Sequence, residues 1–184
     1  LNIAYMTIGE YPSRVPKKFL IPPSVFESKN KFPRFTNVST GMGLDTFSLC
    51  GGCIVDDFDN DGYLDIVVST WNTSGQLRYF RNNGDGTFTE RSEEAGFVGL
   101  FGGLNLVQAD YDNDGDLDIL VLRGAWLKSY GQQPNSLLRN DGHGRFRDVT
   151  FLAGLGEHHF PTQTAAWADY DNDGDLDLYV GNEG

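Results

Sequence analysis

An Asp-rich segment of nine residues recurs three times in this chain of 184 residues, at spacings of 53 and 59 residues. The copies read DFDNDGYLD from Asp57, DYDNDGDLD from Asp110 and DYDNDGDLD again from Asp169. Short apolar runs rich in β-branched residues flank the copies, which predicts a strand on either side of each. A unit repeated with a period near 55 residues indicates a repeat architecture, in which neighbouring units bury one another's apolar faces.

Two further markers recur with the same period. RNNGDGTF from Arg81 and RNDGHGRF from Arg139 carry the Asn, Asp and Gly residues of hairpin turns. An F-x-x-x-[ST]-x-x-x-G segment begins at Phe88 and Phe146, and a fainter copy begins at Phe35. This order predicts about four strands per unit, which is typical of a propeller blade. The expected fold is therefore all-β: an incomplete β-propeller of four-stranded antiparallel blades, about three in number, with a short N-terminal helix. The propeller covers residues 35–184, in approximate units 35–87, 88–145 and 146–184.

The N-terminal segment has a different pattern. Apolar residues at helical spacing predict a helix within residues 1–15, and Pro residues predict an extended linker over residues 16–34. The L-x-x-A-Y-x-x-x-G-x-Y run from Leu1 resembles the first helix of a tetratricopeptide repeat, so residues 1–15 are read as the possible end of such a repeat. The alternative is an amphipathic helix that packs on the propeller. We expect the chain to be a piece of a longer protein.

The acidic residues are concentrated rather than scattered. The formal net charge is −12, and 14 of the 19 Asp residues lie in the three repeated segments. Such a charge opposes binding to nucleic acid or to anionic membrane surfaces. No apolar run has the roughly 20 residues that a membrane-spanning helix needs. Clustered carboxylates of one kind indicate cation binding, because they repel one another strongly without a cation.

The spacing within each segment indicates the metal. Carboxylates stand at positions 1, 3, 5 and 9, Gly at position 6 permits a sharp reversal, and position 7 offers its backbone carbonyl. Several hard oxygen ligands on a flexible turn are what Ca²⁺ prefers, whereas soft metals favour His or Cys. We therefore predict three Ca²⁺ sites, at Asp57, Asp59, Asp61, Tyr63 and Asp65; at Asp110, Asp112, Asp114, Asp116 and Asp118; and at Asp169, Asp171, Asp173, Asp175 and Asp177.

An EF-hand begins in a similar way but requires a Glu at position 12 and flanking helices. Position 12 is Val68, Val121 and Val180 in the three segments, and each lies in an apolar run. The EF-hand is therefore excluded.

D-x-D-x-D-G-x-x-D between two strands resembles the FG-GAP or VCBS repeat of integrin α-subunit propellers. The longer unit, with N-x-G-D-G-x-F, resembles the repeats of the ASPIC/UnbV, cartilage-acidic-protein-like family. The resemblance covers roughly residues 35–184. It implies a calcium-bearing propeller, with Ca²⁺ held at loop positions 1, 3, 5, 7 and 9.

Three other groups of residues call for an interpretation. Cys50 and Cys53 are read as small buried thiols or as a local disulfide, with a redox or metal role as a third alternative. The His158–His159 pair is read as part of a loop, because no third metal ligand is identifiable. The three Trp residues are expected to pack between blades; they are Trp71, Trp126 and Trp167.

These observations favour a non-enzymatic module for protein interaction or adhesion, in which calcium is structural rather than catalytic. The expected location is extracellular, periplasmic or at the cell surface, and the expected partner is a protein or glycan ligand. The alternatives are a lectin-like carbohydrate-binding propeller or an enzyme acting on polysaccharide. A propeller needs roughly 4–8 blades to close, so we expect the remaining blades to come from missing sequence or from another copy.

Overall fold

A computed structural model describes residues 1–27 and 35–183 of the chain. The chain divides into two units, Leu1–Asn37 and Val38–Gly184, and each is described by itself.

The N-terminal unit begins with the helix α1 (Asn2–Thr7), followed by two 3₁₀ turns at Lys17–Phe19 and Pro23–Val25. The helix is shorter than residues 1–15 because Gly9 adopts a positive φ of 73°. The side-chain amide of Asn2 donates to the carbonyl of Phe19 and accepts the N–H of Ile21, at 2.8 and 3.1 Å. Residues 16–27 therefore turn back onto the helix instead of running as the expected extended linker. The rest of that linker, residues 28–34, lies outside the described residues.

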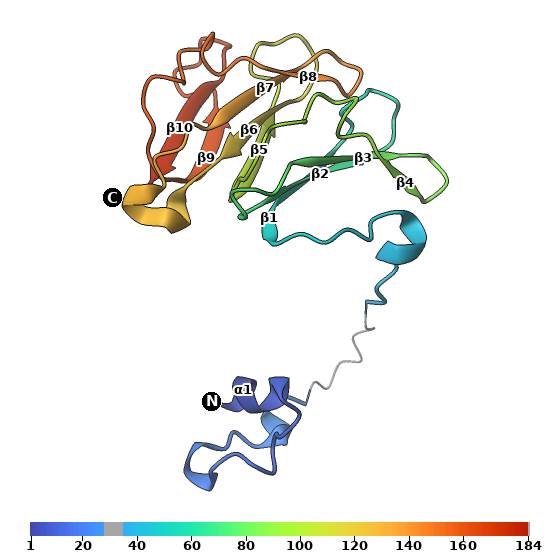
Figure 1. The fold of residues 1–184 in the computed structure, drawn as a ribbon, viewed down its shortest axis with the longest axis vertical. Coiled ribbons are helices and arrows are strands. Elements are labelled where there is room, and N and C mark those ends of the chain that lie inside the picture. Colours follow the sequence, from blue (N-terminus) through green and yellow to red (C-terminus); the bar gives the residue numbers. More distant parts are fainter. Residues whose placement is uncertain (28–34, 184) are drawn as a thin grey trace. The chain divides into compact units, whose positions relative to one another are not determined.

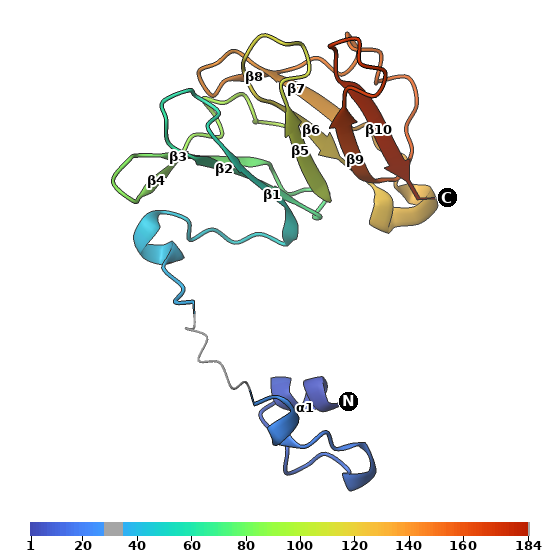
Figure 2. The same ribbon diagram turned by 180° about the vertical axis from the view of Figure 1, so that it is seen from behind.

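The second unit is built from three antiparallel sheets in chain order, which Figures 1 and 2 show from opposite sides. Two sheets have four strands each, and the third has two within the described residues. Each four-stranded sheet keeps the chain order, so every connection is a hairpin between neighbours. The strands are β1 (Cys50–Asp56), β2 (Asp65–Thr70), β3 (Arg78–Asn82) and β4 (Phe88–Glu90); β5 (Asn105–Ala109), β6 (Asp118–Leu122), β7 (Ser136–Asn140) and β8 (Phe146–Asp148); and β9 (Thr162–Ala168) and β10 (Asp177–Asn182).

This architecture confirms the predicted all-β, incomplete propeller with a short N-terminal helix. The boundaries between sheets differ from the boundaries between the units expected from the repeat. The expected second and third units began at residues 88 and 146. Phe88 pairs with Asn82 and Phe146 pairs with Asn140, so each of these segments opens with the last strand of the preceding sheet. The repeat marks a sequence period, whereas the sheet boundary depends on which strands pair.

Burial along the strands follows from the stacking of the sheets. All five residues of β6 are buried because the second sheet has a neighbour on both faces. One face of the second sheet joins a core that includes Phe58, Tyr79, Phe97 and Phe146. The opposite face packs with the third sheet in a second core around Leu120. On β10, by contrast, no position is buried: half-buried and exposed residues alternate from Asp177 to Val180, because one face is less covered than the other.

Short 3₁₀ helices occupy two of the connections, at Ser39–Met42 before β1 and at Ala125–Tyr130 after β6. Across the described ranges, the chain has no helix with the length and apolar character to span a bilayer.

Candidate metal centre

The three Asp-rich segments form the loops of the hairpins β1–β2, β5–β6 and β9–β10. In each hairpin, the pair of residues nearest the loop joins position 9 to the residue that precedes position 1. These pairs are Asp56 with Asp65, Ala109 with Asp118 and Ala168 with Asp177. Positions 1 and 9 are thus held at the mouth of each loop by the sheet itself, and the intervening residues must reverse direction.

Each loop closes on the carboxylate at position 1. Asp57 accepts the N–H groups of Asp61 and Gly62, at 3.1 and 2.8 Å. Asp110 and Asp169 accept the equivalent pairs, at 3.0 and 3.0 Å and at 3.2 and 3.2 Å. Position 4 is always an Asn in the left-handed region, and position 6 is always a Gly with positive φ, which is why these residue types recur. The φ values are 58°, 59° and 61° at Asn60, Asn113 and Asn172, and 88°, 92° and 97° at Gly62, Gly115 and Gly174.

The reversal gathers carboxylates. In each loop, three Asp residues place an oxygen within 4.8 Å of the others. The sets consist of positions 1 and 3 together with position 5 in the first loop or position 9 in the other two. They are Asp57, Asp59 and Asp61; Asp110, Asp112 and Asp118; and Asp169, Asp171 and Asp177.

The remaining predicted residues have other contacts. Asp65 is fully buried and accepts the hydroxyl of Tyr79 at 2.6 Å and the N–H of Asn82 at 2.7 Å. Asp114 and Asp173 accept the N–H of position 7 within their own loops, both at 3.0 Å. The structure therefore brings three of the expected five residues of each loop together directly. Positions 5 and 9 alternate as the third member.

Sequence reasoning missed two arginines, each of which reaches into one of the Asp loops. Arg81 on β3 forms ion pairs with Asp59 and Asp61, and Arg139 on β7 lies 3.9 Å from Asp112. Both residues begin the recurring RN-x-G-x-G marker, so their recurrence is a signal visible in the sequence. In each case a third strand directs a guanidinium at the third position of its own sheet's loop.

Burial and mutual repulsion disfavour the ionised carboxylates. Burial raises the pKa of Asp118 to about 7, in spite of the N–H groups of Asn140 and Tyr111 that it accepts. Burial also raises the pKa of Asp65. At Asp112, burial and then the charge of Asp114 raise the pKa. A divalent cation in the loop would remove this penalty, since it favours the ionised form.

The donor set fits a hard cation. The Oδ1 atom of Asp59 is buried and has no hydrogen-bond partner, although its other oxygen contacts Arg81. A buried carboxylate oxygen without a partner is costly unless a ligand satisfies it. All three gathered sets consist of carboxylates alone, which suits Ca²⁺ better than a metal that favours nitrogen or sulfur.

Neighbouring loops also touch each other. The side-chain amide of Asn60 in the first loop donates to the carboxylate of Asp116 in the second, at 2.7 Å. Asn113 in the second loop donates to Asp175 in the third, at 3.1 Å. Position 4 of one loop thus binds the position 7 side chain of the next, a contact that loop spacing alone did not indicate.

The aromatic residue at position 2 anchors two of the loops between sheets. Phe58 is fully buried, and its ring lies edge-on to those of Tyr79 and Phe146. Tyr111 stacks on Trp167, with ring centroids 6.1 Å apart, which confirms the expected packing between blades for that Trp. Trp71, in contrast, is 45 % exposed.

The two cysteines differ from two of the interpretations made from sequence. Cys50 and Cys53 are unpaired and exposed, at an irregularity in the pairing of β1 with β2, so neither the buried thiols nor the disulfide is observed. His158 lies in the loop before β9, close to the ring of Phe160.

Comparison with known proteins finds one family whose model matches this chain. The family model described as FG-GAP-like repeat matches residues 57–121 and 125–180, and the first match begins at the first residue of the first loop. No curated protein matches the chain.

Proposed function

Because the chain belongs to the FG-GAP-like repeat family, we propose that it is a calcium-binding propeller module for interaction or adhesion outside the cytoplasm. The family and the β-rich repeat fold are established by the match and the sheets. The metal, its ligands and the partner belong to the proposal.

One observation carries the metal assignment. A carboxylate oxygen of Asp59 is buried without a partner inside a loop whose backbone recurs three times. A loop that only needed to turn would not retain several adjacent carboxylates, one of them partly buried, because their repulsion costs free energy.

The proposed ligands are the carboxylates at positions 1, 3, 5 and 9 and the backbone carbonyl at position 7. The second and third loops would use one set each, Asp110, Asp112, Asp114, Asp116 and Asp118, and Asp169, Asp171, Asp173, Asp175 and Asp177. In the first loop, Tyr63 supplies the carbonyl, and Asp57, Asp59, Asp61 and Asp65 supply carboxylates. Bound calcium supplies charge neutralisation and cross-linking of the loop, and we assign it no catalytic step.

The structural role follows from where the loops lie. Each joins the first two strands of its sheet, and neighbouring loops contact each other, so a cation that orders one loop also stabilises the boundary between sheets. A rigid stack of sheets then presents its connecting loops for binding, which suits an interaction module. We propose a protein or glycan as the ligand and a non-enzymatic role.

Calorimetric titration of EDTA-treated, dialysed protein with CaCl₂ tests the metal assignment. We expect three sites, and one fewer in each of the variants Asp59→Ala, Asp112→Ala and Asp171→Ala. Magnesium should bind more weakly, since it demands tighter octahedral geometry. Absence of calcium binding at millimolar concentration in folded protein would overturn the proposal. Screening on glycan arrays and against surface proteins then separates the lectin-like alternative from protein adhesion.

A further inference from the structure

A polar cleft of about 300 Å³ is lined by residues of the first two sheets, each of which has four strands. Its charged side chains come from β3, from the segment after β4, from the first Asp loop and from the turn between β7 and β8. They are Arg81, Arg91, Glu94, Asp59 and Arg145, with His143 beside Arg145. Three guanidinium groups thus meet in one cleft of a chain whose formal net charge is −12.

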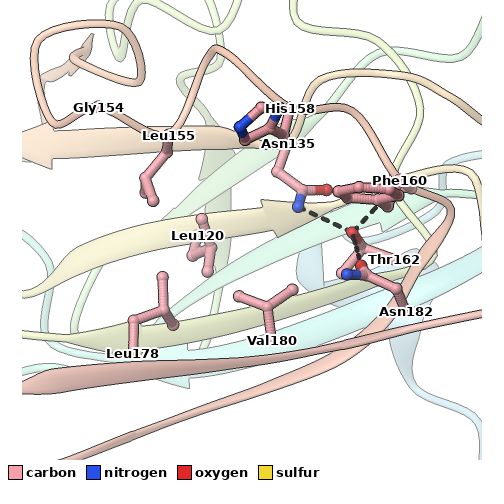
Figure 3. A pocket seen from close by; sticks show the side chains of 10 residues that line it. All are labelled: Leu120, Asn135, Gly154, Leu155, His158, Phe160, Thr162, Leu178, Val180 and Asn182. Atoms are coloured by element: carbon pink, nitrogen blue, oxygen red, sulfur yellow. Dashed lines mark hydrogen bonds between the residues drawn. The ribbon is translucent and has the colours of Figure 1, made fainter.

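The cavity in Figure 3 has the opposite character. It has a volume of about 200 Å³, and Leu120, Leu155 and Leu178 line it. Its Asn side chains are paired through the hydroxyl of Thr162. None of the described residues that line it is Lys, Arg, Asp or Glu. Charged side chains therefore distinguish the cleft between the first two sheets.

Two residues of the cleft mark a departure from the sequence repeat. The turn between β3 and β4 belongs to RNNGDGTF, and the turn between β7 and β8 belongs to RNDGHGRF. Asp85 and Thr87 of the first turn thus correspond to His143 and Arg145 of the second. Asn and Gly residues provide the turn conformation in both copies, and the first copy forms it without a cation. The turn itself therefore does not account for His143 and Arg145.

Backbone contacts hold the cleft in shape. The N–H of Gly144 donates to the carbonyl of Phe58 at 3.0 Å, and the N–H of Arg91 donates to the carbonyl of Tyr79 at 2.8 Å. A Cβ atom at Gly144 would lie 2.7 Å from the hydroxyl oxygen of Tyr79, so the turn lies directly against that side chain. The Tyr79 hydroxyl in turn donates to Asp65. Because these groups already have partners, the cleft offers a ligand its charged side chains.

The three arginines differ in what they contact. Arg81 forms ion pairs with two carboxylates of the first Asp loop. Arg91 pairs with Glu94 at 2.9 Å. Arg145 is exposed, and among the residues that the structure describes it forms no ion pair. A guanidinium presents a planar fork of N–H donors that matches a carboxylate or a tetrahedral oxyanion.

The mixture of charges indicates the class of ligand. Arg91 and Arg145 can donate to an anionic group, while Glu94 can accept hydroxyl groups. An inorganic anion has no hydroxyl groups to donate, and an extended peptide would bring backbone N–H groups for which the cleft has no strand edge. An acidic sugar carries an anionic group and hydroxyl groups together. The volume of about 300 Å³ is at the lower end of the range for small-molecule sites, which suits a sugar unit.

We propose that this cleft binds the sulfate or carboxylate group of an acidic glycan, and that calcium in the first Asp loop strengthens the binding. The inference names a ligand for the module proposed above, and its calcium dependence rests on that proposal. In the absence of metal, Arg81 is held by Asp59 and Asp61. Calcium bound to these carboxylates would neutralise them, so the charge of Arg81 would then act on the cleft.

The probes are galactose 6-sulfate and galacturonate, with galactose as the neutral control. Each is titrated into the whole chain in CaCl₂ and followed through amide chemical shifts. We expect saturable binding of an acidic sugar centred on residues 143–145, and whichever of the two binds more tightly identifies the anionic group. Binding of neither acidic sugar at millimolar concentration would overturn the proposal. So would equally tight binding of inorganic sulfate, or tighter binding of an oligoglutamate peptide, which would make a free anion or an acidic peptide the occupant.

Arg145→Gln removes one guanidinium from the cleft, so the affinity for the sugar should fall at least about tenfold. Arg147→Gln is the matched control, because Arg147 is exposed on the same hairpin but does not line the cleft. It removes the same charge and should change the affinity less than about twofold. Equal losses in the two variants would show an effect of net charge alone and would overturn the site.

Metal-free protein, prepared with EDTA and then dialysed, tests the coupling. We expect its affinity for the sugar to be at least about fivefold lower than in calcium, and the sugar should tighten calcium binding by the same factor. Asp59→Asn removes a charge that holds Arg81, so it should raise the affinity of the metal-free protein for the sugar. Glu93→Gln is the control, since Glu93 is exposed and outside the cleft and the Asp loops. Equal affinity with and without calcium, or equal gains in the two variants, would refute the coupling.

The two proposals fail in different ways. Sugar binding by a chain that binds no calcium would refute the calcium function and the coupling, and would leave the anion site in place. Calcium binding to three loops without sugar binding would do the reverse.

Discussion

The side-chain amide of Asn60 donates a 2.7 Å hydrogen bond to the carboxylate of Asp116, which lies in the next Asp loop 56 residues further along the chain. Asn113 makes the equivalent contact with Asp175 at 3.1 Å. Both donors have positive φ and lie within loops that calcium is proposed to order. Each hydrogen bond therefore joins one candidate metal site to the next.

Asn60→Gly should therefore weaken the boundary between the first two sheets. Gly adopts positive φ freely, so the substitution removes the amide and keeps the loop conformation. We expect a loss of about 0.5–1.5 kcal/mol in the free energy of unfolding, measured by urea denaturation in calcium. Asn172→Gly is the control, since it makes the same change at φ 61° in the third loop. Equal losses in both variants would show that the Asn60 contact contributes nothing.

Calcium should stabilise the fold. With a dissociation constant of roughly 0.1 mM and about 1 mM Ca²⁺, each site adds about 1.4 kcal/mol by linkage. Three sites correspond to a rise in melting temperature of roughly 10 °C over EDTA for a domain of this size. The measurement is differential scanning calorimetry, with magnesium at equal concentration as the control. Superimposable traces in calcium and EDTA would contradict the expectation.

Arg81→Gln should matter most when calcium is absent. The guanidinium forms ion pairs with Asp59 and Asp61, and its hydrogen bond to Asp59 raises the pKa of Arg81. We expect about 0.5–1 kcal/mol of destabilisation in EDTA, the range for partly exposed pairs, and less in calcium, which would neutralise the same carboxylates. Arg139→Gln is the comparison, and it should cost less because its contact is 3.9 Å long. A larger loss in calcium than in EDTA would exclude this role.

Stability in EDTA should fall as the pH rises from about 4 to above 7. Burial raises the pKa of Asp118 to about 7, whereas an Asp in an unfolded chain titrates near 4. The folded state therefore holds a proton that the unfolded state releases. Its stabilisation is complete below about pH 4 and is lost as the pH passes through the folded pKa. Calcium should oppose the loss, so its effect on melting temperature should be larger at pH 8 than at pH 5. A calcium effect that shrinks with rising pH would refute this reasoning.

Phe58→Ala should be among the most damaging single changes. The ring is fully buried against Tyr79 and Phe146, and truncation of a buried Phe typically costs about 3–5 kcal/mol. Tyr170→Ala alters the same loop position, but Tyr170 is 85 % exposed, so we expect a change within about 0.5 kcal/mol. Chemical denaturation of both variants gives the comparison. Similar losses would mean that position 2 acts through the loop itself rather than through packing between sheets.

Local sequence determined the strands and the loops. Apolar runs such as Ile119–Leu122 form strands because their neighbours on both faces exclude water. Asn and Gly at positions 4 and 6 determine the loop conformation, since few other residues tolerate positive φ. Positions 1 and 3 therefore gather in all three loops, as the spacing predicts.

Only the tertiary structure decided what each loop touches. Arg81 and Arg139 reach the carboxylates because β3 pairs with β2 and β7 pairs with β6. Arg81 and Asp59, for example, are 22 residues apart in the sequence. The same repeat leaves Asp65 and Asp118 buried but Asp177 exposed, because burial depends on a neighbouring strand rather than on the residue itself. Backbone preferences act within a few residues and can be read from the sequence, whereas desolvation and ion pairing are set by neighbours that only folding brings together.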